Sequence, residues 1–284
     1  MKILRTVHEL RTAMAQARQD GKTIGLVPTM GALHQGHLSL VKAARADNDC
    51  VVVSVFVNPT QFNNPADLKT YPRTEAADAE LLENAGVDFA FIPSVEEVYP
   101  EPDTRVFDLG PVAEVMEGAM RPGHFNGVAQ IVSKLFSWTM PDRAYFGCKD
   151  FQQIAVIRRM VELEGFNIEI VACPIVREPD GLALSSRNVR LTPEGRKVAP
   201  GIYQTLQKGT EYGMTHNVGE TQKYVTELID DIPGLRTEYF TIADTRTMQP
   251  LAADMSPAGA VGCVTVHCGD VRLIDNIVFP AAGK

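Results

Sequence analysis

The sequence predicts an α/β protein: a doubly wound parallel sheet with helices on both faces, followed by a smaller C-terminal α+β domain. Two observations carry this prediction. Through about residue 173, short β-branched runs alternate with segments whose apolar residues recur at helical spacing, which is typical of βαβ units. Beyond that point helical segments come first and strand-like segments follow. We therefore expect one domain over 1–174 and a second over 175–284.

The strands of the first domain are the short β-branched or apolar runs. Between them, apolar residues three or four positions apart predict helices that bury one face. In chain order the expected strands are Thr23–Val27, Val51–Val57, Phe89–Ile92, Ala144–Phe146 and Ile168–Val171, and the helical stripes are Leu38/Val41/Ala44, Ile131/Leu135/Trp138 and Ile154/Ile157/Val161.

The second domain shows helix signals followed by strand signals. Thr192 is a helix cap and Pro193 suits the first helical turn. A second helix is expected over Val218 to Asp230, and the runs "TEYFTIAD", "AVGCVTVHC" and "VRLIDNI" then read as strands of a small sheet.

The composition of the chain limits which binding partners and which cellular compartment we expect. The chain has 284 residues, 45% of them hydrophobic, with 35 acidic against 27 basic side chains and a net charge of −8. That balance gives no general footprint for nucleic acid or for an anionic membrane. The longest apolar run, "CVVVSVFV", is far below the ~20 residues that a membrane span requires. The first residues do not resemble a secretory signal, so we expect a cytoplasmic protein with no membrane and no nucleic-acid partner.

The five cysteines show no C-x-x-C pair, and we expect free thiols. Cys263 and Cys268 flank His267 at a spacing that could be taken for a metal site. All three lie in an alternating strand-like run, however, and the packing interpretation is favoured over zinc.

The segment "PTMGALHQGH" at 28–37 leaves the first expected strand and enters the first expected helix. At such a strand end, backbone donors and a helix N-terminus converge on ligands. Gly31 permits a turn and Gly36 permits close approach of a base or phosphate, while His34 and His37 can donate to phosphate oxygens. A solvated turn and a zinc pair are the alternatives for the two histidines. The segment matches neither the Walker nor the dinucleotide fingerprint.

Polar side chains also follow two later strands. In "NPTQF", Asn58 and Gln61 offer amide groups at a strand exit. In "GCKDFQQ", Lys149 supplies a cation, Asp150 could accept from a ribose hydroxyl, and Gln153 lies one helical turn beyond. Each segment taken singly is also explained as an ordinary polar strand terminus.

Two loops concentrate charge and hydroxyl groups. "DGLALSSRN" provides Ser185, Ser186 and Arg187, a suitable clamp for a triphosphate near the expected domain boundary. "MRPGHFNGV" places Arg121 and His124 between glycines, which is an unusual composition for a simple connector.

The ordered series "PTMGALHQGH", "FVNPTQF", "YPRT", "EGAMRPGHFNGV", "FGCKDFQQ", "DGLALSSRN" and "RLIDN" resembles the pantothenate synthetase (pantoate–β-alanine ligase) family of the nucleotidyltransferase superfamily, over nearly the whole chain. The resemblance implies a Rossmann-like fold. It also implies ATP-dependent ligation of pantoate and β-alanine to pantothenate, AMP and pyrophosphate through an enzyme-bound pantoyl adenylate. Mg²⁺ and a homodimer are further expectations from the family.

The resemblance also implies roles for individual residues. Gln61 and Gln153 are expected to bind pantoate, and Gln61 also β-alanine. The catalytic set is expected to be His34, His37, Lys149, Ser185, Ser186 and Arg187, with His37 as proton donor, and the ATP-binding set to be Met30, Gly31, Ala32, Leu33, His34, Gln35, Gly36, His37, Gly147, Cys148, Lys149, Asp150, Val176, Leu184, Ser185, Ser186 and Arg187.

The chain departs from the family pattern at two positions. Cys148 stands where glutamate is common, and Ala77 precedes Asp78 where a second acid is common, so the metal ligands stay unassigned. Three other functions remain to be separated from the ligase: a different nucleotidyltransferase, a transfer-RNA charging domain, and a catalytically silent nucleotide-binding sensor.

Overall fold

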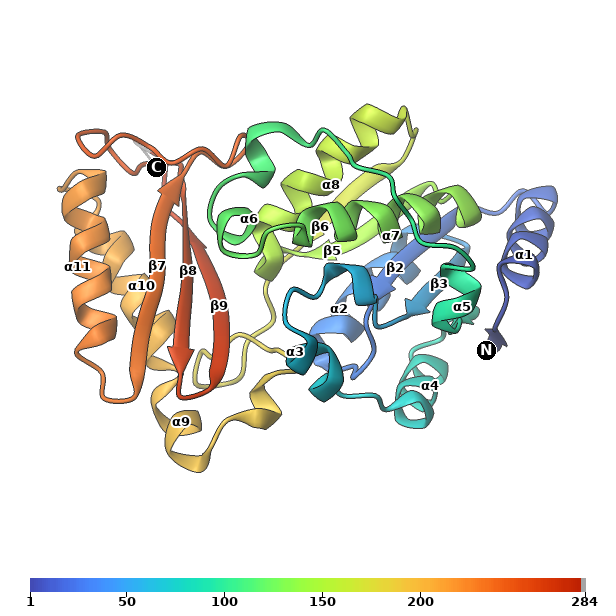
Figure 1. Cartoon of the computed structure of the whole chain (residues 1–284), viewed down its shortest axis with the longest axis horizontal. Coiled ribbons are helices and arrows are strands. Elements are labelled where there is room, and N and C mark those ends of the chain that lie inside the picture. Colours follow the sequence, from blue (N-terminus) through green and yellow to red (C-terminus); the bar gives the residue numbers. More distant parts are fainter. Residues whose placement is uncertain (282–284) are drawn as a thin grey trace. The chain divides into compact units, whose positions relative to one another are not determined.

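The computed structural model describes residues 1–281, and the chain divides into two compact units (Figure 1). The first comprises 1–110, 121–148 and 156–174, and the second comprises 111–120, 149–155 and 175–284. The short segments 111–120 and 149–155 thus cluster with the C-terminal part of the chain, which the sequence did not indicate. The assignment of domains to 1–174 and 175–284 stays a prediction.

A six-stranded, wholly parallel sheet forms the first unit, in the order β1-β4-β3-β2-β5-β6. The predicted Rossmann-like fold class is confirmed. The strand order reverses between β2 and β5, and in open parallel sheets ligands bind beyond the carboxyl ends of strands at such a switch point. The strands are β1 (Lys2–Leu4), β2 (Ile24–Thr29), β3 (Cys50–Val55), β4 (Phe89–Phe91), β5 (Arg143–Gly147) and β6 (Glu169–Cys173).

Helices bury both faces of this sheet. Val27, Val51 and Val53 share one core cluster with Val41 of α2. Alternate residues of a strand point to opposite faces, so the intervening Leu26 and Val52, equally buried, face the other way, where α1 and α7 pack against β2. The helices up to this sheet's last strand are α1 (Val7–Gln19), α2 (Gln35–Asp47), α3 (Pro65–Thr70), α4 (Glu75–Asn84), α5 (Val95–Val98), α6 (Glu117–Met120), α7 (His124–Thr139) and α8 (Phe151–Glu164), with 3₁₀ turns η1 (Pro59–Gln61), η2 (Gly110–Ala113) and η3 (Cys148–Asp150).

The second unit is built on an antiparallel sheet in the order β7-β8-β9. Figure 1 shows α10 and α11 lying along one face of it, where Leu206 and Val225 join the core of the unit. On another side Met116 packs against Val261 and Cys263. The elements are η4 (Asn188–Arg190), α9 (Pro193–Val198), α10 (Gly201–Tyr212), α11 (Val218–Asp230), β7 (Leu235–Ala243), β8 (Val261–Cys268) and β9 (Val271–Val278).

Several element boundaries differ from the predicted ones for local reasons. The helix start at Thr192 is confirmed, since its hydroxyl accepts the N–H of Gly195 at 3.0 Å. That helix ends at Val198, however, and a new one begins after Pro200, whose ring removes a backbone donor. Strand β2 continues through Pro28, which sits opposite Ser54 in the parallel ladder. The three-residue β1 was not predicted at all.

The cysteines are all free thiols, as predicted. Cys263 and Cys268 are buried in β8, while His267 Nε2 lies 2.6 Å from a carboxylate oxygen of Glu238 on the neighbouring strand. Among residues 1–281, none of the helices has both the length and the apolar character to cross a bilayer.

Candidate active site

The histidines of "GALHQGH" form a reciprocal cap at the start of α2. The Nδ1 atom of His34 accepts the N–H of Gly36 at 3.1 Å, and the Nδ1 atom of His37 accepts the N–H of His34 at 3.2 Å. The ring centroids lie 4.1 Å apart. Because both Nδ1 atoms act as acceptors, each neutral ring carries its proton on Nε2, which makes Nε2 a donor. The histidines are therefore ordered parts of the helix start rather than loosely solvated turn residues.

A buried carboxylate folds the loop before these histidines. Asp78 is 2% exposed, and its two oxygens accept the N–H groups of Ala32 at 3.0 Å and Leu33 at 2.8 Å, together with the Thr74 hydroxyl at 3.1 Å. Gly31 has a φ of +81°, and a Cβ there would lie 3.1 Å from Asp78. The loop after β2 thus wraps around a carboxylate supplied by α4, 45 residues later in the chain.

The predicted pantoate ligand Gln61 lies beside the histidine loop. It ends the 3₁₀ turn η1 after β3 and is 9% exposed. Its Oε1 accepts from Asn58 Nδ2 at 3.2 Å, and its Nε2 lies 3.2 Å from Met30 Sδ. Asn58 is itself held by the Tyr99 hydroxyl, which donates to Asn58 Oδ1 at 2.8 Å. The first unit therefore brings Gln61 and Met30, predicted for different substrates, into direct contact.

The "RPGHFNG" segment supports the backbone of Gln61. The carbonyl oxygen of Gln61 lies 2.8 Å from His124 Nδ1 and 3.4 Å from Arg121 Nη2. One turn into α7, a Cβ on Gly127 would lie 2.4 Å from the Thr60 carbonyl oxygen. Only glycine allows this approach of helix and turn, so the composition of "RPGHFNG" is explained by packing against η1.

The end of β5 leads to the predicted residues Gly147 and Cys148. Burial raises the pKa of the Cys148 thiol. The side chain that replaces the family's common glutamate is therefore an uncharged thiol at neutral pH. This part of the site has one negative charge fewer than the family pattern implies.

In the second unit, Val176 and Leu184 are paired. The N–H of Leu184 donates to the Val176 carbonyl at 3.0 Å, and Arg177 and Ala183 form the next antiparallel bridge. This narrow hairpin leads into the serine–arginine segment, where the Ser185 hydroxyl accepts the N–H of Arg187 at 3.2 Å. The second unit therefore joins the separate ATP-binding predictions at 176 and 184–187.

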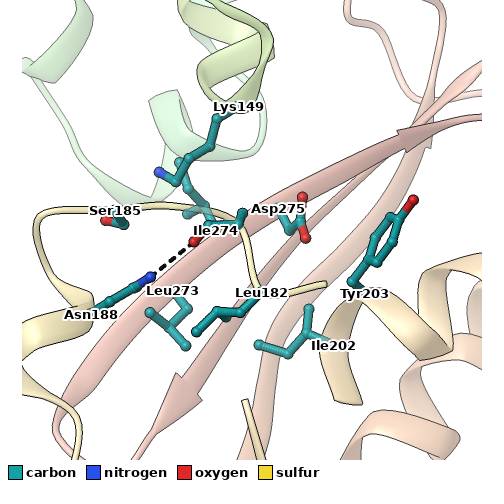
Figure 2. Close-up of a pocket in the computed structure, with 10 residues that line it drawn as sticks. Lys149, Leu182, Ser185, Asn188, Ile202, Tyr203, Leu273, Ile274 and Asp275 are labelled. Atoms are coloured by element: carbon teal, nitrogen blue, oxygen red, sulfur yellow. Dashed lines mark hydrogen bonds between the residues drawn. The ribbon is translucent and has the colours of Figure 1, made fainter. Parts of the chain in front are cut away.

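Lys149 and Ser185 line a common small pocket in the second unit (Figure 2). The figure shows the Lys149 ammonium group directed toward the side on which Ser185 lies, and Asn188 bonded through Nδ2 to the Ala183 carbonyl at 3.0 Å. The cavity volume is about 10 Å³, which is room for about one water molecule. The remaining lining residues are Leu182, Ile202, Tyr203, Leu273, Ile274 and Asp275.

The adjacent glutamines of "FQQ" have separate environments. Gln152 is 5% exposed, donates to the carbonyls of Val112 and Val115, and accepts the N–H of Glu117 at 3.1 Å. It fastens the 112–117 segment to α8 within the second unit. Gln153, the predicted pantoate ligand, is half-buried on the next position, and Asp150 is exposed.

The predicted site residues thus form two groups, one in each unit. Met30 to His37 and Gln61 lie together in the first unit, and Lys149, Val176 and Leu184 to Arg187 are linked in the second. Sequence reasoning named Asp78 only as the acid that remains after Ala77, and it gave Gly127 no role of its own. Asp78 is recognised by its burial against a loop with a positive φ, and Gly127 by its contact with the Thr60 carbonyl. Neither feature has a sequence pattern from which it could have been predicted.

Comparisons with known proteins agree on one family. The family model for pantoate–β-alanine ligase matches residues 2–278. A pantothenate synthetase of Phocaeicola vulgatus is 61% identical over 280 residues, covering 98% of this chain and 99% of that protein. The crystal structure of a pantothenate synthetase from Thermus thermophilus superposes with a TM-score of 0.92 at 49% identity, covering 99% of this chain and 100% of that one.

A second solved structure was determined with ligands. The pantoate–β-alanine ligase of Francisella tularensis, described as a complex with "Beta-gamma ATP" and β-alanine, superposes with a TM-score of 0.82 at 36% identity, covering 98% of this chain and 97% of that one.

Proposed function

Since the chain belongs to the pantoate–β-alanine ligase family, we propose that it joins the two substrates at the expense of ATP through an enzyme-bound pantoyl adenylate, with AMP and pyrophosphate as the other products. The observation that carries this proposal is the reciprocal histidine cap at the start of α2, in which both Nδ1 atoms accept backbone N–H groups and each ring keeps its Nε2–H as a donor. The ATP and β-alanine complex of the Francisella relative supports the choice of nucleotide and amine.

The first half-reaction is attack of the pantoate carboxylate on the α-phosphorus of ATP, with pyrophosphate leaving. The attacking oxygen is already anionic, so no general base is required. The obstacle is negative charge, because a carboxylate approaches a polyphosphate and the leaving group gains charge. Donors fixed in advance toward that charge lower the barrier by roughly 3–4 kcal/mol each.

His34 and His37 suit this task in the first unit. Their Nδ1 atoms are occupied by backbone donors, so the ring orientation is set before any nucleotide binds. We assign His37 Nε2–H as the proton donor to the phosphate oxygens, with His34 Nε2–H as its neighbour. Preorganised donors of this kind require no reorientation during the reaction.

The second unit supplies the cation and the hydroxyls. Lys149 and Ser185 share one pocket, and we assign them, with Ser186 and Arg187, to the phosphates of ATP. An arginine can bind phosphate through two parallel N–H donors, which a lysine cannot. We assign the paired backbone of Val176 and Leu184 to the remainder of the nucleotide.

Gln61 and Gln153 are our candidates for pantoate, and Gln61 also for β-alanine. A glutamine amide offers both a donor and an acceptor, which suits a substrate that carries a carboxylate and hydroxyl groups. In the second half-reaction the β-alanine amine attacks the acyl carbon of the adenylate and AMP leaves. Exclusion of water at this stage protects the adenylate from hydrolysis.

Among the site residues predicted from the sequence, Asp150 is our candidate for binding the Mg²⁺ that the family implies. Both oxygens of Asp78 accept hydrogen bonds from the histidine loop and Thr74, while Asp150 is exposed beside Lys149. Within residues 1–281 there is no group of three metal-binding side chains. Mg²⁺ commonly binds one or two carboxylates together with substrate phosphates and waters. We assign Asp150 as its protein ligand, where the ion would neutralise phosphate charge.

A cytoplasmic homodimer, with domains over 1–174 and 175–284, is part of the same proposal. The five free thiols support the location, and the family supports the dimer. Light scattering on the purified protein would measure the assembly, and a mass of one chain, 31.1 kDa, would contradict it.

Single-turnover experiments test the adenylate. Enzyme in excess is mixed with ATP and pantoate without β-alanine, and pyrophosphate and pantoyl adenylate are measured after acid quench. We expect both to form at one equivalent, and pantothenate and AMP to appear when β-alanine is added. Pyrophosphate formation that requires β-alanine would contradict the two-step scheme. A stable nucleotidyl product would favour another nucleotidyltransferase, and ATP binding without turnover would favour a sensor.

A further inference from the structure

Two buried residues near the end of β9, Asp275 and Asn276, contact both segments that we assign to ATP in the second unit. They are 6% and 5% exposed. They belong to the "RLIDN" segment, which the proposed function does not use. Asp275 also lines the pocket that contains Lys149 and Ser185 (Figure 2).

Asp275 holds the hairpin through Arg177. Arg177 donates to the two carboxylate oxygens of Asp275 at 2.6 and 2.9 Å, and the two side chains are 16% and 5% exposed. A two-pronged pair of this kind fixes direction as well as distance. Asp275 Oδ1 also accepts the N–H of Asn276 at 2.8 Å, which orients the carboxylate on its own strand.

Arg177 in turn fixes the tip of the hairpin. Its Nη1 donates to the Gly181 carbonyl at 3.2 Å, and its guanidinium lies 3.6 Å from the centre of the Tyr203 ring. A Cβ on Gly181 would lie 2.8 Å from that ring, and its φ is +97°. The hairpin turn, the arginine and the tyrosine are therefore packed in one arrangement, directly before the serine–arginine segment.

Asn276 holds the other segment. Its Nδ2 donates to the backbone carbonyl of Lys149 at 3.0 Å. Two adjacent residues of β9 thus fasten the hairpin through Arg177 and the backbone of Lys149 directly. Strand β9 is paired with β8 along its whole length, which makes it a rigid reference for both.

We infer that Asp275 and Asn276 are positioning residues for the reaction, which set the location of Lys149 relative to the Ser185–Arg187 segment. This inference rests on the proposed function, because it assumes that both segments bind ATP. Neither residue is assigned a contact with substrate. A misplacement of about 1 Å in such a constellation can reduce the rate about 100-fold.

The test compares Asp275→Asn and Asn276→Ala with Glu238→Gln. Glu238 is a matched control, since it forms a two-pronged pair with Arg272 at 2.9 and 2.9 Å in the same sheet, but is assigned no part in the site. We expect kcat/KM for ATP to fall about 10- to 100-fold in the two β9 variants. We expect Glu238→Gln to keep a kcat/KM near that of wild type, at a melting temperature similar to that of the β9 variants.

Amide hydrogen exchange gives a local readout, because a general loss of stability would also accelerate exchange of the β8 and β9 amides. The N–H of Leu184, bonded to Val176, is expected to exchange faster in Asp275→Asn and at the wild-type rate in Glu238→Gln. If Asp275→Asn does not fold, Arg177→Lys replaces it, because lysine keeps the charge and loses the fork. Wild-type kcat/KM in the β9 variants, or an equal loss in Glu238→Gln, would overturn the inference.

Lys149→Ala separates this inference from the proposed function. If Lys149→Ala keeps full turnover, the ATP site itself has been misassigned. If Lys149→Ala is inactive while both β9 variants match wild type, the ATP site stands and the positioning role alone is wrong.

Discussion

The Asp78 carboxylate accepts the backbone N–H of Leu33 at 2.8 Å, which ties α4 to the loop that carries the two histidines. A buried acid is costly unless its oxygens are hydrogen-bonded, and here three donors satisfy it. Both oxygens are occupied by donors from the "GALH" loop and from Thr74, so Asp78 stabilises the fold of that loop.

Replacement of Asp78 by asparagine is expected to loosen this loop. The amide nitrogen would face a backbone N–H, which leaves a buried donor unmatched at a cost of about 1–3 kcal/mol. We expect a lower melting temperature and a higher KM for ATP, measured by thermal unfolding and steady-state kinetics. Glu83→Gln is the control, because Glu83 lies on the same helix with its side chain 68% exposed. Unchanged unfolding in Asp78→Asn would contradict the role.

Two substitutions of His37 separate helix capping from proton donation. In His37→Asn the Oδ1 atom can replace Nδ1 as acceptor for the His34 N–H, but no donor remains at the place of Nε2. We expect near wild-type stability with kcat lowered about 10²- to 10³-fold. His37→Ala removes both functions, and we expect an additional loss of about 1 kcal/mol in unfolding free energy. Full activity of His37→Asn would exclude Nε2 as the donor.

Gly127→Ala is expected to destabilise the fold, although helix propensity alone predicts that it is stabilising. Inside a helix, alanine is more favourable than glycine by about 1 kcal/mol. The new Cβ would lie 2.4 Å from the Thr60 carbonyl oxygen, and such overpacking costs about 1–3 kcal/mol. We therefore expect net destabilisation in urea titrations, together with a higher KM for pantoate because η1 carries Gln61, which we propose binds pantoate. Ser137→Ala, at an exposed position of α7, is the control. Net stabilisation would show that helix and turn separate easily.

The lowered pKa of Asp103 predicts that the stability of the fold depends on pH. Its side chain is 4% exposed, and hydrogen bonds from Arg105 lower its pKa to about 2. A carboxyl whose folded pKa is depressed below about 3.9 stabilises the fold above that pH and loses the contribution as pH falls toward 2. Because Arg105 is 46% exposed, we expect solvent screening to reduce the contribution to about 1 kcal/mol.

The comparison of wild type with Asp103→Asn measures this contribution. The difference in unfolding free energy is expected to be constant from pH 7 to about 5 and to shrink to about half by pH 3. Asp108→Asn, at an exposed position of the same loop, controls for the loss of one negative charge. A difference that grows as pH falls would contradict the sign.

The alternation of strands and helices was sufficient to predict the parallel sheet and the C-terminal sheet, because burial imposes a period on each element that a single sequence displays. Helix α11 illustrates this, since its observed bounds are the predicted Val218–Asp230. The strand through Pro28 was not predicted, because pairing with Ser54 overrides the local preference of proline there. The split after Val198 has a local cause, the missing backbone donor of Pro200, which the sequence analysis did not use.

The residues of the candidate site were predicted from motif composition and family resemblance. The buried residues that hold them in place, such as Asp78 and Asn276, were not predicted. His34 and His37 stand close together in the sequence, so their capping arrangement follows from local spacing. Asp78 and Asn276 act on residues 45 and 127 positions away. Such contacts depend on how the strands are ordered in space, and no local pattern encodes them.

The absence of a side chain at position 127 also restricts how substrate preference could be altered. Thr60, Gln61 and the first turn of α7 touch across that glycine and must change together. Met30, which meets Gln61 through a flexible thioether, is not constrained in this way. Met30 Sδ lies beside the Gln61 amide that we propose binds pantoate. Directed evolution toward hydroxy acids larger than pantoate should therefore find single-step adaptations at Met30, whereas gains at the helix would require several simultaneous mutations.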